Sequence, residues 1–250
     1  MVLDEAARLK LQRYIRESQK ITVLTGAGMS TESGIPDFRS PGGIWEDEET
    51  MIAMSLSYWQ EYPELFWPKF KRIFMNELHL KAQPNAGHYA ITHLEELGKQ
   101  VTVLTQNVDG LHQLAGSTHV LELHGGIRQA FCPVCQSRYN LDYVLAEEVP
   151  RCSYVSIKGA VCDTVLQADV VLFEQEVRHL PEALRAVRTC DLMLVLGTSL
   201  TVYPVADLPR YVIQERTKLV IVNLDETEED HRADLVIHDK VGKVLAEAVQ

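Results

Sequence analysis

Four short runs of apolar and mostly β-branched residues recur along the chain, and each ends in glycine or in polar residues. They are residues 21–25, 101–105, 191–197 and 218–225. Runs this short and this continuously apolar are typical of strands that are buried on both faces. Between them, apolar positions recur at helical spacing in residues 5–18, 85–97, 180–187 and 206–215. This alternation predicts an α/β fold with a doubly wound, parallel, Rossmann-like sheet, in which ligands bind beyond the carboxyl ends of the strands.

Two stretches interrupt this alternation. Residues 43–84 are rich in aromatic side chains, and residues 128–165 hold four of the five cysteines. We interpret them as insertions that form a smaller domain, a helical module plus a metal-binding module, with a cleft between this domain and the sheet. The Rossmann-like domain then consists of residues 1–42, 85–127 and 166–250. Because aromatic residues at helical spacing usually pack inward, we expect the aromatic stretch to be mainly core.

Composition and charge narrow the class of protein. With 250 residues, 46% of them hydrophobic, the chain can bury a large core, so disorder is excluded as its main state. Acidic residues outnumber basic ones by 35 to 24, a net charge of −11, and we therefore expect no nucleic-acid ligand. No apolar run approaches the roughly 18 residues of a membrane span, so we expect no membrane association and a cytoplasmic location. Five cysteines indicate reduced thiols or a metal site, and nothing requires more than a monomer.

The segment GAGMSTESGIPDFRS, residues 26–40, follows the first predicted strand. A glycine turn at a strand end lets backbone N–H groups approach a phosphate closely. The dehydrogenase fingerprint is incomplete, because Thr31 stands where a third glycine is needed and no acidic residue ends a second strand about 20 residues later. Hydride transfer is therefore disfavoured, whereas dinucleotide binding is not.

Six motifs follow one another along the chain: GAGMSTESGIPDFRS, TQNVDGLH (105–112), LHGG (123–126), CPVC (132–135), GTSLTVYP (197–204) and VNLD (222–225). Together they resemble the motifs of the sirtuins, the NAD-dependent protein deacylases. They occur in the order of the family and cover the chain almost from end to end. The resemblance implies a bacterial-type sirtuin that removes acetyl groups from protein lysines and yields lysine, nicotinamide and O-acetyl-ADP-ribose.

The resemblance also implies which residues bind NAD. They are Gly26, Ala27, Gly28, Thr31, Asp37, Phe38, Arg39, Gln106, Val108, Asp109, Gly197, Thr198, Ser199, Asn223, Asp225 and Val241. The first glycines would contact the pyrophosphate, and Phe38 and Arg39 lie on the loop that covers the nicotinamide ribose in similar proteins. Val108 and Asp109 would line the nicotinamide pocket. Gly197, Thr198 and Ser199 would bind the adenosine side, Asn223 and Asp225 would reach the adenine ribose, and Val241 would contact the adenine.

His124 and Asn107 are the predicted catalytic residues. One histidine among nine would ordinarily be considered structural, but the place of His124 in LHGG assigns it as the general base. A neutral imidazole near physiological pH can accept a proton from a ribose hydroxyl. In similar proteins the acetyl oxygen attacks C1′ of the nicotinamide ribose, nicotinamide leaves, and the activated hydroxyl attacks the resulting imidate carbon. His112 and His119 match no such role and are predicted to be structural.

Cys132, Cys135, Cys152 and Cys162 resemble a four-thiolate zinc site. The second pair departs from the family pattern, because nine residues separate its cysteines where two to four are usual. A metal fixes the positions of its ligands and not the path between them, so the site can still close. Four protein thiolates leave no open position, and we expect a structural zinc. Cys190 lies apart and is predicted to be a buried small hydrophobe.

The segments expected to bind the peptide substrate depart from the family pattern as well. In similar proteins the peptide pairs with two segments, here residues 170–173 and 199–203, and Glu174-Gln175 replaces the usual glycine and acidic residue. Glu174 would place a charged side chain where the peptide backbone passes. Sirtuins that remove acidic acyl groups carry a tyrosine and an arginine in this channel, whereas residues 51–60 are apolar and have no arginine, so we expect a neutral acyl channel. Removal of longer neutral acyl groups and protein ADP-ribosylation remain alternatives.

Overall fold

A parallel six-stranded sheet forms the larger part of the computed structural model, which describes residues 4–37 and 48–249. In spatial order its strands are β3 (Val120–Glu122), β2 (Gln100–Thr105), β1 (Lys20–Thr25), β7 (Leu192–Leu196), β8 (Lys218–Val222) and β9 (Leu235–Ile237). The strand order reverses between β1 and β7, and this is where open α/β sheets bind their ligands. The predicted doubly wound fold is confirmed.

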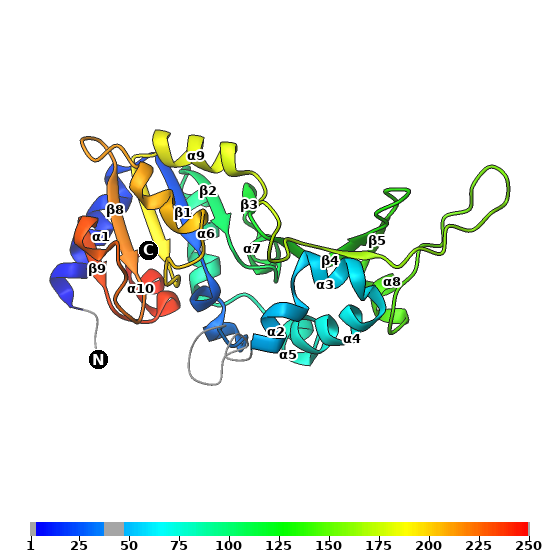
Figure 1. Ribbon diagram of the computed structural model, residues 1–250. Coiled ribbons are helices and arrows are strands. Elements are labelled where there is room, and N and C mark those ends of the chain that lie inside the picture. The colour runs from blue at the N-terminus through cyan, green and yellow to red at the C-terminus, as the bar shows by residue number, and fades with distance from the viewer. Residues whose placement is uncertain (1–3, 38–47, 250) are drawn as a thin grey trace.

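Helices cover both faces of this sheet (Figure 1). One face packs on α1 (Glu5–Glu17), α6 (Ala86–Glu96) and α10 (Val241–Ala248), and the other on α9 (Leu180–Thr189) and the 3₁₀ segment η4 (Val205–Tyr211). Neighbouring strand residues point to opposite faces, so Val23 joins the first cluster and Leu24 the second. The middle strands are apolar almost without break because both of their faces are buried.

One predicted helix is wrong in type. Residues 206–215 form no α-helix; the tighter η4 ends at Tyr211. Pro209 lies inside this segment, and because proline has no backbone N–H and clashes with the preceding turn, it does not allow an α-helix to continue.

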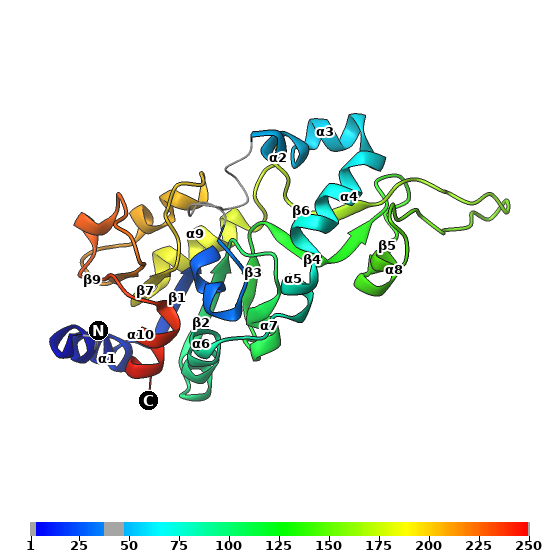
Figure 2. The same cartoon turned by 90° about the horizontal axis from the view of Figure 1, so that it is seen from below.

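A second, smaller body lies beside the sheet (Figures 1 and 2). It contains an antiparallel sheet of β5 (Arg138–Asn140), β4 (Gly125–Phe131) and β6 (Gln167–Val170). Its helices are α2 (Glu48–Ala53), α3 (Leu56–Glu61), α4 (Pro63–Phe74), α5 (Glu77–Lys81) and α8 (Leu141–Ala146). The aromatic residues of α4 are buried together with β4 and β6, which confirms that this stretch is mainly core.

Short elements follow or precede several strands of the large sheet. The 3₁₀ turns η1 (Ala27–Met29) and η2 (Thr31–Ser33) follow β1, α7 (Leu111–Ala115) follows β2, and η5 (Asp230–Arg232) precedes β9. In the part of the chain that the structure describes, every helix is too short or too polar to cross a membrane.

Candidate active site

A pocket of about 810 Å³ opens beyond the carboxyl ends of the parallel strands and reaches into the smaller body. A cavity of this size is large enough for a cofactor-sized ligand. Most of the residues predicted from the sequence line it. They are Gly26, Ala27, Gly28, Thr31, Asp37, Gln106, Asn107, Val108, His124, Gly197, Thr198, Ser199, Asn223, Asp225 and Val241. The predictions for Phe38 and Arg39 lie outside the described residues.

The floor of the pocket is formed by two loops in backbone contact. Gly28 N donates to Gly197 O at 2.8 Å, and Gly26 N donates to Leu196 O at 3.2 Å. A Cβ added to Gly197 would lie 2.4 Å from Met29 N, and Gly197 has a φ of +59°. Both observations require glycine. The contact brings the loop predicted at the pyrophosphate next to the loop predicted on the adenosine side, at the point where the strand order reverses.

Asn107 lies at the centre of a buried polar network. Its carboxamide nitrogen donates to Gly26 O at 3.0 Å and to Ser30 Oγ at 3.1 Å. The Ser30 hydroxyl donates to Asp109 Oδ2 at 2.7 Å, and the other Asp109 oxygen accepts from Leu111 N. Burial raises the pKa of the Asp109 carboxyl, while these hydrogen bonds oppose the shift. The network fixes the orientation of the Asn107 side chain at the pocket wall.

His124 stands between β3 and β4, where the sheet meets the smaller body. Its Nδ1 lies 3.0 Å from Gln106 O. A carbonyl oxygen can only accept, so Nδ1 carries the proton and Nε2 is the basic nitrogen of the neutral ring. Burial lowers the pKa of His124, and the hydrogen bond to Gln106 partly offsets that shift. The imidazole is therefore neutral at physiological pH and able to accept a proton.

Behind the pocket, two buried histidines continue this polar network into the core. His112 Nε2 lies 3.0 Å from Thr25 Oγ1, which donates to Thr105 Oγ1, and Thr105 Oγ1 accepts from Asn107 N. The ring centroids of His88 and His112 lie 4.8 Å apart. Burial lowers the pKa of His112 to about 3 and that of His88 to about 4, so both are neutral in the fold.

The end of the pocket in the smaller body is apolar. Met54, Phe70, Phe74, Val170 and Leu172 line it. Phe70 and Phe74 therefore belong both to the core of the smaller body and to the pocket wall. Such a surface suits a neutral acyl chain, because a carboxylate placed there would lose its hydration without a partner.

The four predicted zinc ligands lie together. Their sulfur atoms are all within 4.8 Å of one another, with 3.7 Å between Cys132 and Cys162 and 3.4 Å between Cys135 and Cys152. A zinc tetrathiolate with Zn–S bonds of about 2.3 Å has sulfur–sulfur edges of about 3.8 Å. The hydrogen bond with the Ser137 hydroxyl lowers the pKa of the Cys135 thiol to about 6, which favours the thiolate that a metal binds. The donor set fits a structural zinc ion.

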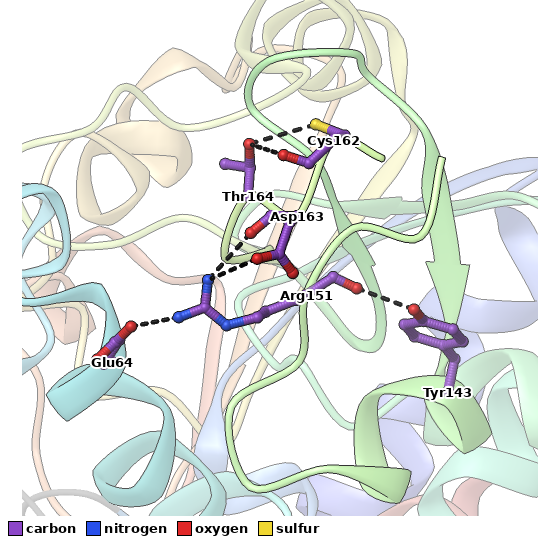
Figure 3. A network of polar contacts seen from close by, with 6 residues as sticks. All are labelled: Glu64, Tyr143, Arg151, Cys162, Asp163 and Thr164. Atoms are coloured by element: carbon purple, nitrogen blue, oxygen red, sulfur yellow. Dashed lines mark hydrogen bonds and ion pairs between the residues drawn. The ribbon is translucent and has the colours of Figure 1, made fainter. Parts of the chain in front are cut away.

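Arg151 ties this cysteine cluster to its surroundings (Figure 3). Its guanidinium donates to Asp163 O at 3.0 Å and pairs with Glu64 of α4, and its own carbonyl accepts from Tyr143 of α8. Thr164 Oγ1 lies 3.2 Å from Cys162 Sγ. The nine residues between the last two cysteines form a hairpin in which Val155 pairs with Val161. The longer spacing is therefore accommodated without separating the sulfur atoms.

Glu174 lines the pocket, and its carboxylate turns to α3, where it accepts from Ser57 N and from Ser57 Oγ, each at 2.9 Å. These two donors at the start of α3 hold the side chain. That Glu174 lies where the peptide backbone passes stays a prediction.

Several polar residues of the site were not predicted, among them Ser30 and Glu32. Ser30 joins Asn107 to Asp109, and Glu32 lines the pocket and accepts from Gly242 N at 2.6 Å, which ties the first glycine loop to α10. Both lie within the glycine-rich segment, so their place directly after a buried strand was a usable signal.

Known proteins resemble this chain in sequence and in structure. Residues 26–204 match the Sir2 family. The chain is 51% identical over 231 residues to the NAD-dependent protein deacetylase of Bacillus subtilis (strain 168), which covers 92% of this chain and 94% of that protein. A Sir2 structure with a deacetylated p53 peptide and 3'-O-acetyl ADP ribose is 35% identical, with a TM-score of 0.85 and 96% of each chain covered. A Sir2 structure with a p53 peptide and NAD+ is 35% identical, with a TM-score of 0.81 and 94% of each chain covered.

Proposed function

The chain belongs to the Sir2 family, and we propose that it is an NAD-dependent protein deacetylase in which His124 is the general base and Asn107 the second catalytic residue. It removes acetyl groups from protein lysines with NAD as co-substrate, and the products are lysine, nicotinamide and O-acetyl-ADP-ribose. The acetyl group is transferred to ADP-ribose while water releases the lysine, so the reaction is both a transfer and a hydrolysis. The observation that carries the proposal is the pocket that joins the two glycine loops, Asn107 and His124 to an apolar channel.

His124 supplies the base through Nε2. Because Nδ1 donates to Gln106 O, the ring presents Nε2 in one fixed tautomer, and burial keeps it unprotonated near neutral pH. This nitrogen would accept the proton of a ribose hydroxyl as that hydroxyl attacks the imidate carbon.

Asn107 and its neighbours hold the nicotinamide half of the co-substrate. The buried bonds from Asn107 to Gly26 and Ser30 orient its carboxamide before a ligand arrives, so little entropy is lost on binding. Val108 lines the pocket beside it, and Asp109 lies one layer behind. We assign these groups to the nicotinamide carboxamide and the ribose next to it.

The residues that we assign to the phosphates and the adenosine lie in the loops after the parallel strands. The loop of Gly26, Ala27 and Gly28 would approach the pyrophosphate, where its two glycines, which have no side chains, give close access. Thr198 and Ser199 continue toward the adenosine, and Asn223 donates to Asp225 O at 2.9 Å at the ribose end. Val241 begins α10 at the far wall.

Zinc would be held by Cys132, Cys135, Cys152 and Cys162 and would stabilise the smaller body. It has no part in catalysis, since four thiolates complete its coordination.

The cytoplasmic location, the monomeric state and the absence of nucleic-acid binding stay predictions.

The apolar end of the pocket favours a second activity, removal of longer neutral acyl groups. Met54, Phe70 and Phe74 offer the channel no charge for a dicarboxyl chain. Propionyl and butyryl peptides compared with acetyl and succinyl peptides test this, and we expect succinyl turnover to be the slowest.

Mass spectrometry of the products tests the main proposal. An acetyl-lysine peptide is incubated with and without NAD, and we expect O-acetyl-ADP-ribose only with NAD. A positioned base contributes about 10²- to 10⁴-fold, so His124→Ala should lose that much turnover and keep NAD binding. His119→Ala, which removes an exposed histidine nearby, is the matched control. Full turnover in His124→Ala would refute the assignment of the base.

A further inference from the structure

The loop after β6 is tied to the helical module of the smaller body by its backbone. Phe173 N donates to Met54 O at 3.1 Å, and Leu56 N donates to Phe173 O at 3.0 Å. Residues 170–173 are the segment assigned to the peptide, and Met54 lines the apolar end of the pocket. One short connection therefore joins the peptide side of the site to the acyl side.

Glu174 adds a side-chain connection at the same place. Its two carboxylate oxygens accept from the backbone N–H and from the hydroxyl of Ser57, both at 2.9 Å. The N–H groups in the first turn of a helix lack partners within the helix, and the carboxylate satisfies one of them in α3. Hydrogen bonds to an ionised acceptor are the stronger kind.

The backbone at Glu174 is strained. Its φ is +76°, in the left-handed region that residues with a Cβ rarely adopt. Such a conformation persists only where the surroundings hold it, and such residues gather at functional sites. Glycine would relieve the strain but would have no carboxylate for Ser57. The two bonds to Ser57 are what this chain gains from glutamate at a position that favours glycine.

We propose that Glu174 is a positioning residue for the acyl-lysine substrate. Its bonds to Ser57 lock the loop 171–175 onto α3, so that the peptide edge and Met54 keep a fixed spacing when the acyl-lysine enters. The inference rests on the proposed function, because the peptide edge is assigned from the family. The carboxylate acts by holding the loop through the two hydrogen bonds that Ser57 donates to it, so the effect on peptide binding should not depend on the charge of the peptide.

Steady-state kinetics on the full-length, zinc-loaded protein test this position. The proteins are wild type, Glu174→Gly, Glu174→Gln and Ser57→Ala, and the substrates are two acetyl-lysine peptides, one flanked by lysines and one by glutamates. We expect Glu174→Gly to raise the peptide KM by about three- to tenfold for both peptides, the range for losing a typical hydrogen bond. The KM for NAD should stay unchanged.

The other two variants distinguish the positioning role of Glu174 from an effect of its negative charge on peptide binding. Glutamine keeps the shape and can accept from Ser57 N while its NH₂ donates to Ser57 Oγ, so Glu174→Gln should restore most of the peptide affinity without the charge. Ser57→Ala removes one of the two bonds and should raise the peptide KM by about two- to threefold. Glu174→Gly also removes the strained side chain, so a folding defect is not expected from it.

Three results would overturn the inference. They are an unchanged peptide KM in Glu174→Gly, a Glu174→Gln variant as weak as Glu174→Gly, and an effect that differs between the two peptides; the last two would show that Glu174 acts through its charge. A wild-type protein without NAD-dependent deacetylation would overturn the proposed function and this inference with it, whereas the three results above leave the function intact.

Discussion

The two walls of the pocket are built by different means. On the sheet side, backbone meets backbone, as where Gly28 N donates to Gly197 O at 2.8 Å. On the side of the smaller body, which we call the side-chain wall, side chains add to the backbone bonds of Phe173, as between Glu174 and Ser57 at the pocket and within the cysteine cluster, which does not line the pocket. Backbone contacts leave no room for substitution, whereas side-chain contacts can be exchanged. Both departures from the sirtuin pattern, Glu174 and the spacing of Cys152 and Cys162, lie on the side-chain wall.

Gly197→Ala disrupts the backbone contact between the two glycine loops and should have the largest effect on stability and on NAD binding. The new Cβ would lie 2.4 Å from Met29 N, at a φ of +59°. Strain and overpacking together should cost about 4 kcal/mol of unfolding free energy and abolish measurable NAD binding. Chemical denaturation and calorimetric titration with NAD measure the two losses.

Gly98→Ala is the matched control for that variant. Gly98 also has a positive φ, +81°, but a Cβ there would have nothing within 4 Å. Its cost should be about 1 kcal/mol from backbone strain alone, with NAD binding intact. Equal losses in the two variants would show that strain, and not contact between the loops, governs the backbone wall.

The same difference between the walls explains what the sequence could predict. β1 and β7 are predicted correctly because a strand buried on both faces is an uninterrupted apolar run, and the polar loops after them meet at one sheet edge by topology. β9 and β6 were missed. β9 has only three residues, and β6 reads Gln-Ala-Asp-Val, with Asp169 paired to Arg178 and Arg138. The Glu174–Ser57 contact joins positions 117 residues apart, and no periodicity in the chain encodes it.

Cys162→Ser weakens the side-chain wall at its metal site. Zinc binding is coupled to folding, so replacing one of four thiolates should lower the zinc content and cost about 3 kcal/mol of stability in the smaller body. Cys190→Ala removes a thiol that lies outside the cluster and should keep the zinc. Metal analysis with thermal denaturation measures both variants. Wild-type zinc content in Cys162→Ser would remove Cys162 from the ligand set.

A moderate fall in pH below neutral should already lower the stability of the body that contains the parallel sheet. Burial lowers the pKa of His88 to about 4 and of His112 to about 3, so the unfolded chain binds these protons first, from about pH 6.5 downward. Their stabilising effect is complete above pH 6.5 and is lost as the pH falls through these two values. Two protons give a slope of about 2 kcal/mol per pH unit near pH 5.

Denaturation curves between pH 7.5 and 4.5 test this slope. His112→Gln removes one of these two groups and should lower the slope by about 1 kcal/mol per pH unit, while His119→Gln, at an exposed position, should leave it unchanged. A slope that is the same in all three proteins would mean that carboxyl groups, and not the buried histidines, set the acid sensitivity.

Ile157→Asp should have the smallest effect, although it introduces a charge at an apolar residue of the side-chain wall. Ile157 is fully exposed at the end of the hairpin between Cys152 and Cys162, and the hydrogen bonds that close this hairpin are local, such as Ser156 N to Ala160 O. Substitutions of exposed residues that make no packing contacts usually change the free energy of unfolding by no more than about 0.5 kcal/mol. Zinc content, Tm and kcat/KM should therefore equal those of wild type. A loss of kcat/KM at unchanged Tm would instead show that the hairpin contacts the substrate protein, and the side-chain wall would then extend beyond the pocket to the end of this insertion.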